Sequence, residues 1–418
     1  MRQLVIFILL NLSMRLVAQE EISFSVTLDK SCLDLPVAIV LDNMETNNDS
    51  IQWILYEITR NKHKVVNSQM EPGVNNKLWF VMEGETPKNS TRSFQIKKEK
   101  KTGKNTTNNV LQMRKADGNL TLYADQSPVF SYRYETMFPP RGVDPLFKRS
   151  GFIHPLWSPK GEILSRVQPP DHYHHYGIWG PWTLTHIGDR EVDFWNLNKG
   201  EGTVKFAGFL SETTGSVFSG LRVLQQHIDF GAKGEDQIAM NEVLDVRVWN
   251  SSQGVWIIDY TTAINTPLKD GIMLDAYRYG GGIGYRATEK WTKENCTVLT
   301  SEGKTRADAD GSTARWCIVE GESAVDEGRS GILFMSHPAN RAHPEPMRVW
   351  PLDGNGGRGD MYFEFTPIRH QSWNLKNGND YVLKYRMIVF DGRMDKETAE
   401  MYWRSFSGAP AIQIESIN

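Results

Sequence analysis

Histidines concentrate in one stretch of the sequence. Five of the ten histidines lie between residues 154 and 186, and the densest part reads Pro-Pro-Asp-His-Tyr-His-His-Tyr-Gly over residues 169–177. Proline favours extended backbone in the residue before it, and a glycine closes the stretch, so we expect a strand or an extended loop here. On an extended backbone His172 and His174 point to one face and His175 points to the other.

Two imidazoles on one face, two residues apart, offer a metal ion two nitrogen ligands. A third ligand could come from Asp171, Glu191, His337 or His343. The same rings could instead transfer protons near neutral pH or donate hydrogen bonds to sugar hydroxyl groups. A purely structural role, with the rings stacked on aromatic side chains, is the alternative. So many titratable side chains in one stretch favour a functional site, with a divalent metal as the candidate cofactor.

A second polar stretch, residues 336–351, follows an apolar run at 331–335. We expect the run to be a buried strand and the polar stretch to be a loop at its end, which is where binding sites are commonly built. A proline-rich bend without a function is the alternative. The candidate site residues of this stretch are His337, Asn340, His343 and Glu345.

A glycine-rich stretch, residues 277–286, lies between these two candidates. It is not a phosphate-binding loop, because no Gly-Lys-Ser/Thr follows and no helical pattern begins there. Its glycines instead allow the backbone to approach a ligand or a neighbouring strand closely, and Arg286 could anchor a hydroxyl or carboxylate group. Near the histidines, Trp179 could stack on a sugar ring or belong to the core, and His154 is a further candidate for substrate binding.

The rest of the chain indicates an all-β fold. Short β-rich runs separated by polar turns predict a small Ig-like β-sandwich domain over residues 20–96. The charged stretch 97–109 predicts a linker or long exposed loop, with a solvated hairpin tip as the alternative. Residues 110–408 predict a large antiparallel β-sandwich domain that carries the histidine-rich site. Within it we expect a hairpin around residues 250–254 and one short helix from about residue 396 to residue 405.

The N-terminus indicates export. Residues 1–19 combine a positive start, an apolar run and a small residue before Gln19, which is the pattern of a signal peptide. No later stretch has the roughly 20 apolar residues that a membrane span needs. The formal charge of -3 and the lack of a strongly basic face argue against nucleic acid as a partner. The expected ligand of this periplasmic or secreted protein is therefore a small molecule or an oligosaccharide.

Three cysteines are too few and too scattered for a disulfide framework or a thiolate zinc site. Cys296 and Cys317 could pair with each other. Cys32 would then be a lone buried thiol.

Several motifs together resemble the domain-of-unknown-function family labelled methane oxygenase PmoA-like. They are Arg-Ser-Gly-Phe-Ile-His-Pro-Leu-Trp-Ser-Pro-Lys-Gly-Glu at 149–162, Asp-His-Tyr-His-His-Tyr-Gly-Ile-Trp at 171–179, Asp-Phe-Trp at 193–195, Gly-Gly-Ile-Gly-Tyr-Arg at 281–286 and His-Pro-Ala-Asn at 337–340. The resemblance covers about residues 110–408. Methane oxidation itself is set aside, because that enzyme subunit is an integral membrane protein and this chain has no candidate span. Members of the family resemble exported proteins that accompany polysaccharide breakdown, which implies a role with sugars.

The leading hypothesis is an exported carbohydrate-active enzyme, a hydrolase, lyase or epimerase that acts on a glycan fragment. His172 and His174 would bind a metal or transfer protons, with Asp171 and Glu345 as supporting or proton-transfer groups. Trp179 and Arg286 would hold the sugar. The alternatives are a non-catalytic glycan-binding protein and a metal-dependent oxidoreductase with a histidine-rich copper or iron site.

Overall fold

The computed structural model describes residues 21–41, 51–60, 62–100, 111–231, 235–251, 254–325 and 328–417. The predicted signal peptide lies outside the described residues, as do residues 101–109 of the predicted linker. Residues 97–100 of that linker belong to a strand. The described part of the chain contains no helix that is long and apolar enough to cross a membrane.

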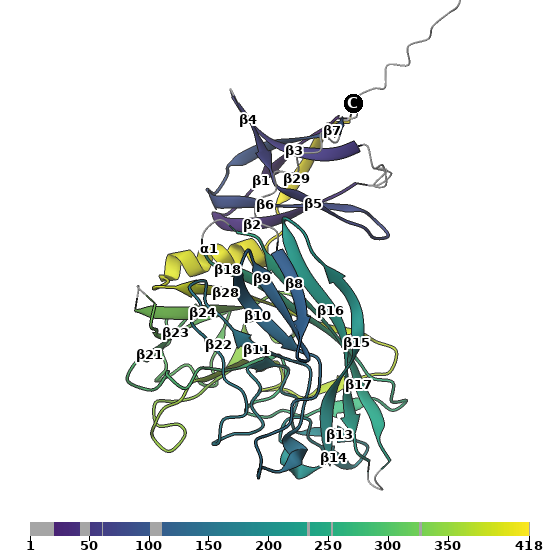
Figure 1. Ribbon diagram of the computed structural model, residues 1–418, viewed down its shortest axis with the longest axis vertical. Helices are drawn as coiled ribbons and strands as arrows, with labels where there is room; N and C mark the ends of the chain where they lie inside the picture. Colours follow the sequence, from purple (N-terminus) through teal and green to yellow (C-terminus); the bar gives the residue numbers. More distant parts are fainter. Residues whose placement is uncertain are drawn as a thin grey trace, which may run out of the picture.

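A small β-sandwich lies at one end of the molecule (Figure 1). Its five-stranded sheet has the order β29 (Ala411–Ile417), β1 (Glu21–Thr27), β7 (Thr91–Lys100), β3 (Ile51–Thr59) and β4 (Lys62–Val66). Its three-stranded sheet has the order β2 (Cys32–Val40), β6 (Lys77–Thr86) and β5 (Ser68–Glu71). Phe24, Phe80 and Phe94 pack between the sheets, with the rings of Phe24 and Phe94 stacked at 5.3 Å.

The large sandwich consists of two long antiparallel sheets. The nine-stranded sheet has the order β22 (Thr313–Ala314), β25 (Glu345–Val349), β26 (Tyr362–Phe365), β20 (Ile283–Arg286), β12 (Ile178–Trp179), β11 (Phe152–Leu156), β10 (Ser127–Arg133), β9 (Asn119–Ala124) and β8 (Leu111–Ala116). The eight-stranded sheet has the order β15 (Gly202–Thr213), β16 (Phe218–Asp229), β17 (Gln237–Trp249), β18 (Trp256–Asn265), β28 (Tyr381–Asp391), β24 (Arg329–Ser336), β23 (Trp316–Glu322) and β21 (Cys296–Thr300). A small third sheet joins β14 (Arg190–Val192), β13 (Thr185–Ile187), β19 (Ile272–Leu274) and β27 (Trp373–Leu375).

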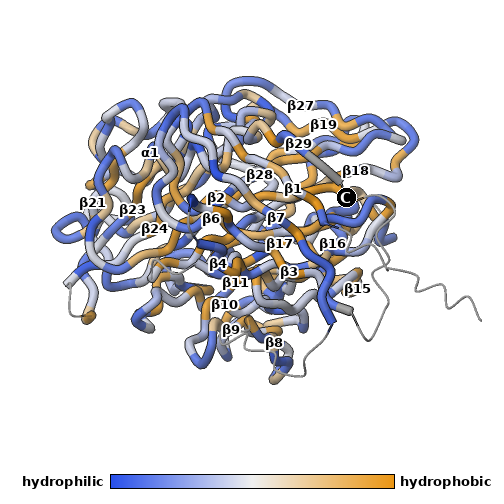
Figure 2. Tube along the Cα trace, turned by 90° about the horizontal axis from the view of Figure 1, so that it is seen from above, coloured by the Kyte–Doolittle hydropathy of each residue, from blue (hydrophilic) through white to orange (hydrophobic). Residues whose placement is uncertain are grey.

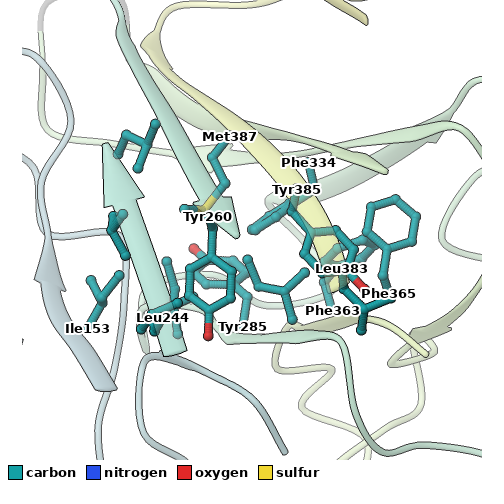
Figure 3. Packing of buried hydrophobic residues seen from close by; sticks show 14 of the residues in the cluster. Ile153, Leu244, Tyr260, Tyr285, Phe334, Phe363, Phe365, Leu383, Tyr385 and Met387 are labelled. Atoms are coloured by element: carbon teal, nitrogen blue, oxygen red, sulfur yellow. The ribbon is translucent and has the colours of Figure 1, made fainter. Parts of the chain in front are cut away.

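The two long sheets enclose an aromatic core, shown in Figure 3. Tyr285 and Phe363 come from the nine-stranded sheet, and Phe334 comes from the eight-stranded sheet. The Phe334 ring lies 5.2 Å from that of Tyr285 and stacks at 4.6 Å on that of Phe363. Seen from above, apolar strand segments fill the middle of the molecule, and hydrophilic segments run mainly along its periphery (Figure 2). The predicted all-β fold of two sandwiches is confirmed.

The predicted local elements of the large sandwich are confirmed as well. Strands β17 and β18 form the expected hairpin, with Trp249 opposite Ile257. From Ile258 to Asn265 in β18, buried and partly exposed residues alternate, as the period of a half-buried strand requires. The apolar run at 331–335 lies within β24, and every one of its residues is buried.

The predicted terminal helix is α1 (Lys396–Ser407), which lies between the two sandwiches (Figure 1). Asp395 caps its N-terminus by accepting a hydrogen bond from the Thr398 amide at 2.7 Å. Near the C-terminal end of the helix, the Ser405 hydroxyl donates to the Leu33 carbonyl of β2 at 2.7 Å. After the helix the chain returns to the small sandwich as β29, which the sequence had left unassigned.

The disulfide prediction is wrong, because Cys32, Cys296 and Cys317 are all buried free thiols. Cys296 lies opposite Gly321 on the neighbouring strand, whereas Cys317 lies opposite Thr300. The two cysteines are therefore displaced by four positions, or about 13 Å along the strands. A disulfide requires Cα atoms within about 7 Å.

Candidate functional site

The histidine stretch is a compact loop that leads into β12. The His172 amide donates to the Pro169 carbonyl at 2.9 Å, and the His175 amide donates to the His172 carbonyl at 3.0 Å. A further bond from the Gln168 amide to the His175 carbonyl, at 2.7 Å, closes the base of the loop. The prediction of an extended segment is therefore wrong, because successive turns replace the strand that the prolines and Gly177 had suggested.

This turn brings three imidazoles together instead of two. The ring centroids of His172, His174 and His175 lie between 4.8 and 5.4 Å apart. One nitrogen of each ring lies within 4.8 Å of the others, so the three side chains can act as ligands of one metal ion. His175, which the extended backbone would have placed on the opposite face, is the member of this group that the sequence interpretation missed.

Strand pairing explains why other parts of the chain meet these histidines. Arg286 ends β20 and lies opposite Tyr362, the first residue of β26. The Arg286 amide also donates to the carbonyl of Gly177, just before β12, at 2.8 Å. Because neighbouring strands are antiparallel, the start of β12, the end of β20 and the start of β26 lie at the same end of the strands.

Asp171 connects the histidines to a buried arginine. Its carboxylate contacts His172 Nδ1 at 2.8 Å and accepts from Arg286 Nη2 at 2.6 Å. Burial opposes ionisation of Asp171, but the hydrogen bond to His172 and the charge of Arg286 outweigh it, so the pKa of Asp171 lies well below its usual range. A carboxylate on Nδ1 fixes the ring orientation and leaves Nε2 for a metal or a proton.

Burial keeps His174 and His175 neutral. It lowers the pKa of His174 to about 4, and the nearby His172 adds to the effect. It also holds the pKa of His175 well below the usual value, and the nearby His174 and Arg286 lower it further. Neutral imidazoles are the form that binds metals and accepts protons.

The three histidines open into a pocket of about 270 Å³. Its walls are largely aromatic, and the Trp195 and Tyr362 rings stack at 5.8 Å. The rim comes from the loop after β14, the loop before β20 and the loop between β25 and β26. The lining residues are His172, His174, His175, Trp195, Arg278, Tyr279, Arg348, Trp350, Pro351, Gly354, Asn355 and Tyr362.

Two predicted residues, Arg286 and Trp179, pack against this pocket without lining it. Arg286 is fully buried, with its guanidinium 4.7 Å from the Trp350 ring. Trp179 is also buried, and its ring centroid lies 5.4 Å from that of His175. His154, which was predicted to bind the substrate, is not among the lining residues, and its side chain contacts the Ser165 hydroxyl at 2.9 Å.

The second predicted segment forms a separate cluster. Glu345 is fully buried and accepts from the Ser336 and Tyr385 hydroxyls, each at 2.7 Å, and from Asn340. Glu345 begins β25, whereas Arg348 near the other end of this strand lines the pocket, so about 10 Å of strand separates Glu345 from the pocket lining.

The two histidines of that segment lie beside helix α1. His343 stacks on the Trp403 ring, with the two planes 6° apart. His337 lines a different hollow, between the two sandwiches, together with Lys384 and Arg386. The structure thus brings Asp171, His172, His174, Trp179 and Arg286 together and leaves His337, Asn340, His343 and Glu345 elsewhere.

The sequence interpretation also missed pocket residues: it did not name Arg278 and Arg348, although they lie in the stretches 277–286 and 336–351, and it recognised no pattern around Asn355 and Tyr362. One pattern could have indicated the loop between β25 and β26, because it contains four glycines within residues 351–359. Flexible connections between rigid strands often carry binding residues.

The glycine-rich stretch does allow close approach, as predicted. A side chain on Gly281 would lie 2.2 Å from the Trp182 ring, and one on Gly282 would lie 2.2 Å from the Phe365 carbonyl. Both glycines have positive φ angles, 85° and 61°. They let the segment before β20, which carries Arg278 and Tyr279, turn tightly beside β26.

The chain belongs to the family of unknown function DUF6807, which matches residues 119–404. The predicted membership in a family of unknown function is therefore confirmed, whereas the PmoA-like label gains no support. No curated protein sequence matches the chain.

Among solved structures, the chain is similar to an alpha-mannosidase from Enterococcus faecalis V583, with 9% identity and a TM-score of 0.42 over 95% of this chain and 46% of that one. It is also similar to a protein of glycosyl hydrolase family 38 from Enterococcus faecalis, with 9% identity and a TM-score of 0.39 over 95% of this chain and 47% of that one. The chain thus spans less than half the length of either protein.

Proposed function

We propose that the protein is an exported enzyme that acts on a glycan fragment, and that His172, His174 and His175 form its reactive centre by holding a divalent metal ion. The observation that carries this proposal is the convergence of three imidazoles in the lining of one pocket. Export rests on the signal-peptide pattern of residues 1–19.

The donor set suits a metal ion. Imidazole nitrogens favour zinc, copper, iron or nickel over calcium or magnesium. Around zinc, at about 2.0–2.1 Å from each nitrogen, tetrahedral ligand atoms lie about 3.4 Å apart. The three imidazole nitrogens lie within 4.8 Å of one another, and the Asp171 carboxylate on His172 Nδ1 would orient that ring.

The pocket suits a sugar ring. Aromatic faces such as those of Trp195, Trp350 and Tyr362 match the apolar C–H faces of a pyranose, while the imidazoles and Asn355 offer hydrogen bonds to hydroxyl groups. At about 270 Å³ the pocket is slightly below the usual range of small-molecule sites, roughly 300–1,000 Å³. This size fits one sugar unit at the end of a glycan better than a long internal stretch.

The residue types that line the pocket also indicate which reaction mechanisms are compatible with it. Among the described residues that line the pocket there is no Asp or Glu, whereas most glycosidases use a pair of carboxylates. Chemistry centred on a metal or on imidazoles fits this lining better. Within the proposed group of hydrolases, lyases and epimerases, mechanisms without a carboxylate pair are favoured.

Incubation with a panel of oligosaccharides, followed by product analysis, tests the proposal. We expect turnover by the wild type and a loss of at least about 100-fold in His174→Ala, as for removal of a reacting group. His63→Ala, which changes an exposed histidine of β4 in the small sandwich, serves as the control. Full activity of His174→Ala would contradict the proposal, and binding without any turnover would identify a glycan-binding protein instead.

A further inference from the structure

The rim of the histidine pocket is positively charged. Arg278 and Arg348 line it, and no acidic residue of the described chain accompanies them in the lining. Arg278 is exposed on the segment before β20, and its guanidinium lies 5.3 Å from the Tyr279 ring. Arg348 comes from β25, on the other side of β26. Two guanidinium groups from different elements thus border one opening.

The positive charges of these arginines are not fully neutralised by acidic side chains. Arg348 and Arg369 both bind Asp310, at 2.6 and 3.1 Å. Arg278 forms no ion pair with any described residue, and Arg369 donates to its backbone carbonyl at 2.6 Å. Arg348 and Arg369 therefore share one carboxylate, and Arg278 pairs with none among the described residues, which leaves an excess of positive charge at the rim.

The charged residues behind the histidines differ from those at the rim, because each forms an ion pair. Arg286 binds Asp171 at 2.6 Å and lies 3.5 Å from Asp360, which also pairs with Arg358. The inner arginine therefore serves to hold Asp171. Of the outer arginines, Arg278 has no ion pair with a described residue and Arg348 shares Asp310 with Arg369, so both can bind a further anionic group in the pocket that they line.

Building on the proposed sugar-active function, we propose that the substrate is an acidic sugar, a uronic acid unit whose carboxylate is bound by Arg278 and Arg348. The planar guanidinium fork matches a carboxylate in geometry as well as in charge. The aromatic walls would hold the apolar face of the same ring, and its hydroxyl groups would face the histidines. Charge at the rim would also raise the rate at which an anionic glycan reaches the pocket.

Calorimetric titration of the full chain tests this inference, with glucuronate and galacturonate compared against glucose and galactose. We expect the acidic sugars to bind at least about tenfold more tightly, as one additional charge-assisted contact provides. The preference should disappear in Arg278→Ala and in Arg348→Ala. Arg278→Lys should keep part of it, because lysine retains the charge but not the fork.

Arg393→Ala is the matched control, because it removes an exposed arginine that pairs with Glu320 away from the pocket. Circular dichroism reports whether each variant is folded. If Arg348→Ala fails to fold, Arg278→Ala decides alone, since this exposed side chain has no ion pair to lose within the described chain.

The outcomes separate this inference from the function on which it rests. Equal binding of acidic and neutral sugars would overturn the acidic substrate and leave the sugar-active function standing. Tighter binding of glucose 6-sulfate than of either uronate would overturn the carboxylate assignment in favour of a sulfated sugar. Failure of every sugar to bind would overturn both.

Discussion

Asp171 holds the site together because its carboxylate contacts His172 and Arg286 at the same time. Its side chain is 21% exposed, whereas the side chain of Arg286 is fully buried. A carboxylate in this position selects the imidazole tautomer that presents Nε2 to a metal ion.

Asp171→Asn should therefore weaken metal binding by about 10- to 100-fold, the usual effect of losing a carboxylate that orients a ligand. Competition with a chromogenic chelator measures the affinity. Asp189→Asn, at an exposed turn, is the control and should leave the affinity unchanged. Unaltered zinc affinity in Asp171→Asn would show that His172 is oriented by other means.

At this scale the sequence indicated the types of residue better than their arrangement. Asp171, His172, His174 and Arg286 were all predicted as site residues and do lie together. His175 was placed on the wrong face because the prediction assumed an extended backbone. The hydrogen-bonded turns that the loop forms instead are not indicated by any strong residue pattern. Arg278 and Arg348 join the pocket only through tertiary contacts.

The strands that position the pocket depend on a tight turn before β20. Gly281→Ala should destabilise the fold by roughly 2–4 kcal/mol, since the new methyl group would meet the Trp182 ring at 2.2 Å and the backbone has a φ of 85°. Gly378→Ala is a matched control with a φ of 81° and no atom within 4 Å, so only the backbone cost of about 1 kcal/mol applies. Urea unfolding of both variants measures the difference, and equal losses would mean that the close packing at Gly281 is not rigid.

A buried carboxyl group links β24, β25 and β28. Burial raises the pKa of Glu345 from about 4.5 to about 7, although Ser336 and Tyr385 donate hydrogen bonds to it. Because the pKa is raised in the folded state, the protonated group stabilises the fold fully below about pH 4.5. This contribution is lost as the pH rises through about 7.

Glu345→Gln imitates the protonated group at every pH. Wild type should therefore lose stability relative to this variant between pH 5 and pH 8, by an amount on the order of 3 kcal/mol. Thermal unfolding at a series of pH values measures it. Parallel stability curves for the two proteins would show that Glu345 is ionised throughout this range.

At the scale of elements, prediction succeeded where the pattern is local. The hairpin of β17 and β18, the buried β24 and helix α1 all have periodicity that can be recognised within a dozen residues. The pairing of β29 with β1 could not be predicted this way, because it joins the two ends of the chain and no local pattern specifies so distant a partner.

At the scale of the whole molecule, strand β29 connects the end of the large sandwich back to the small one. β29 covers one edge of β1, while the helix before it packs between the sandwiches. Both sandwiches are therefore tied to each other by α1 and by contacts such as Trp79 with Trp249, whose ring centroids are 5.1 Å apart.

Truncation before residue 411 should expose the edge of β1 and loosen the small sandwich. Hydrogen exchange should then become faster at the β1 amides, whereas the amides of β16 and β17 in the large sandwich should remain protected. Unchanged exchange in β1 would mean that β29 adds nothing to its stability.

The central claim is that three histidines form a metal centre, and elemental analysis of the purified protein tests it most directly. We predict about one zinc, copper, iron or nickel ion per chain in the wild type and in the control His63→Ala, and none in the double variant His172→Ala, His174→Ala. Absence of metal from the wild type after incubation with each of these ions, or an undiminished metal content in the double variant, would contradict the account.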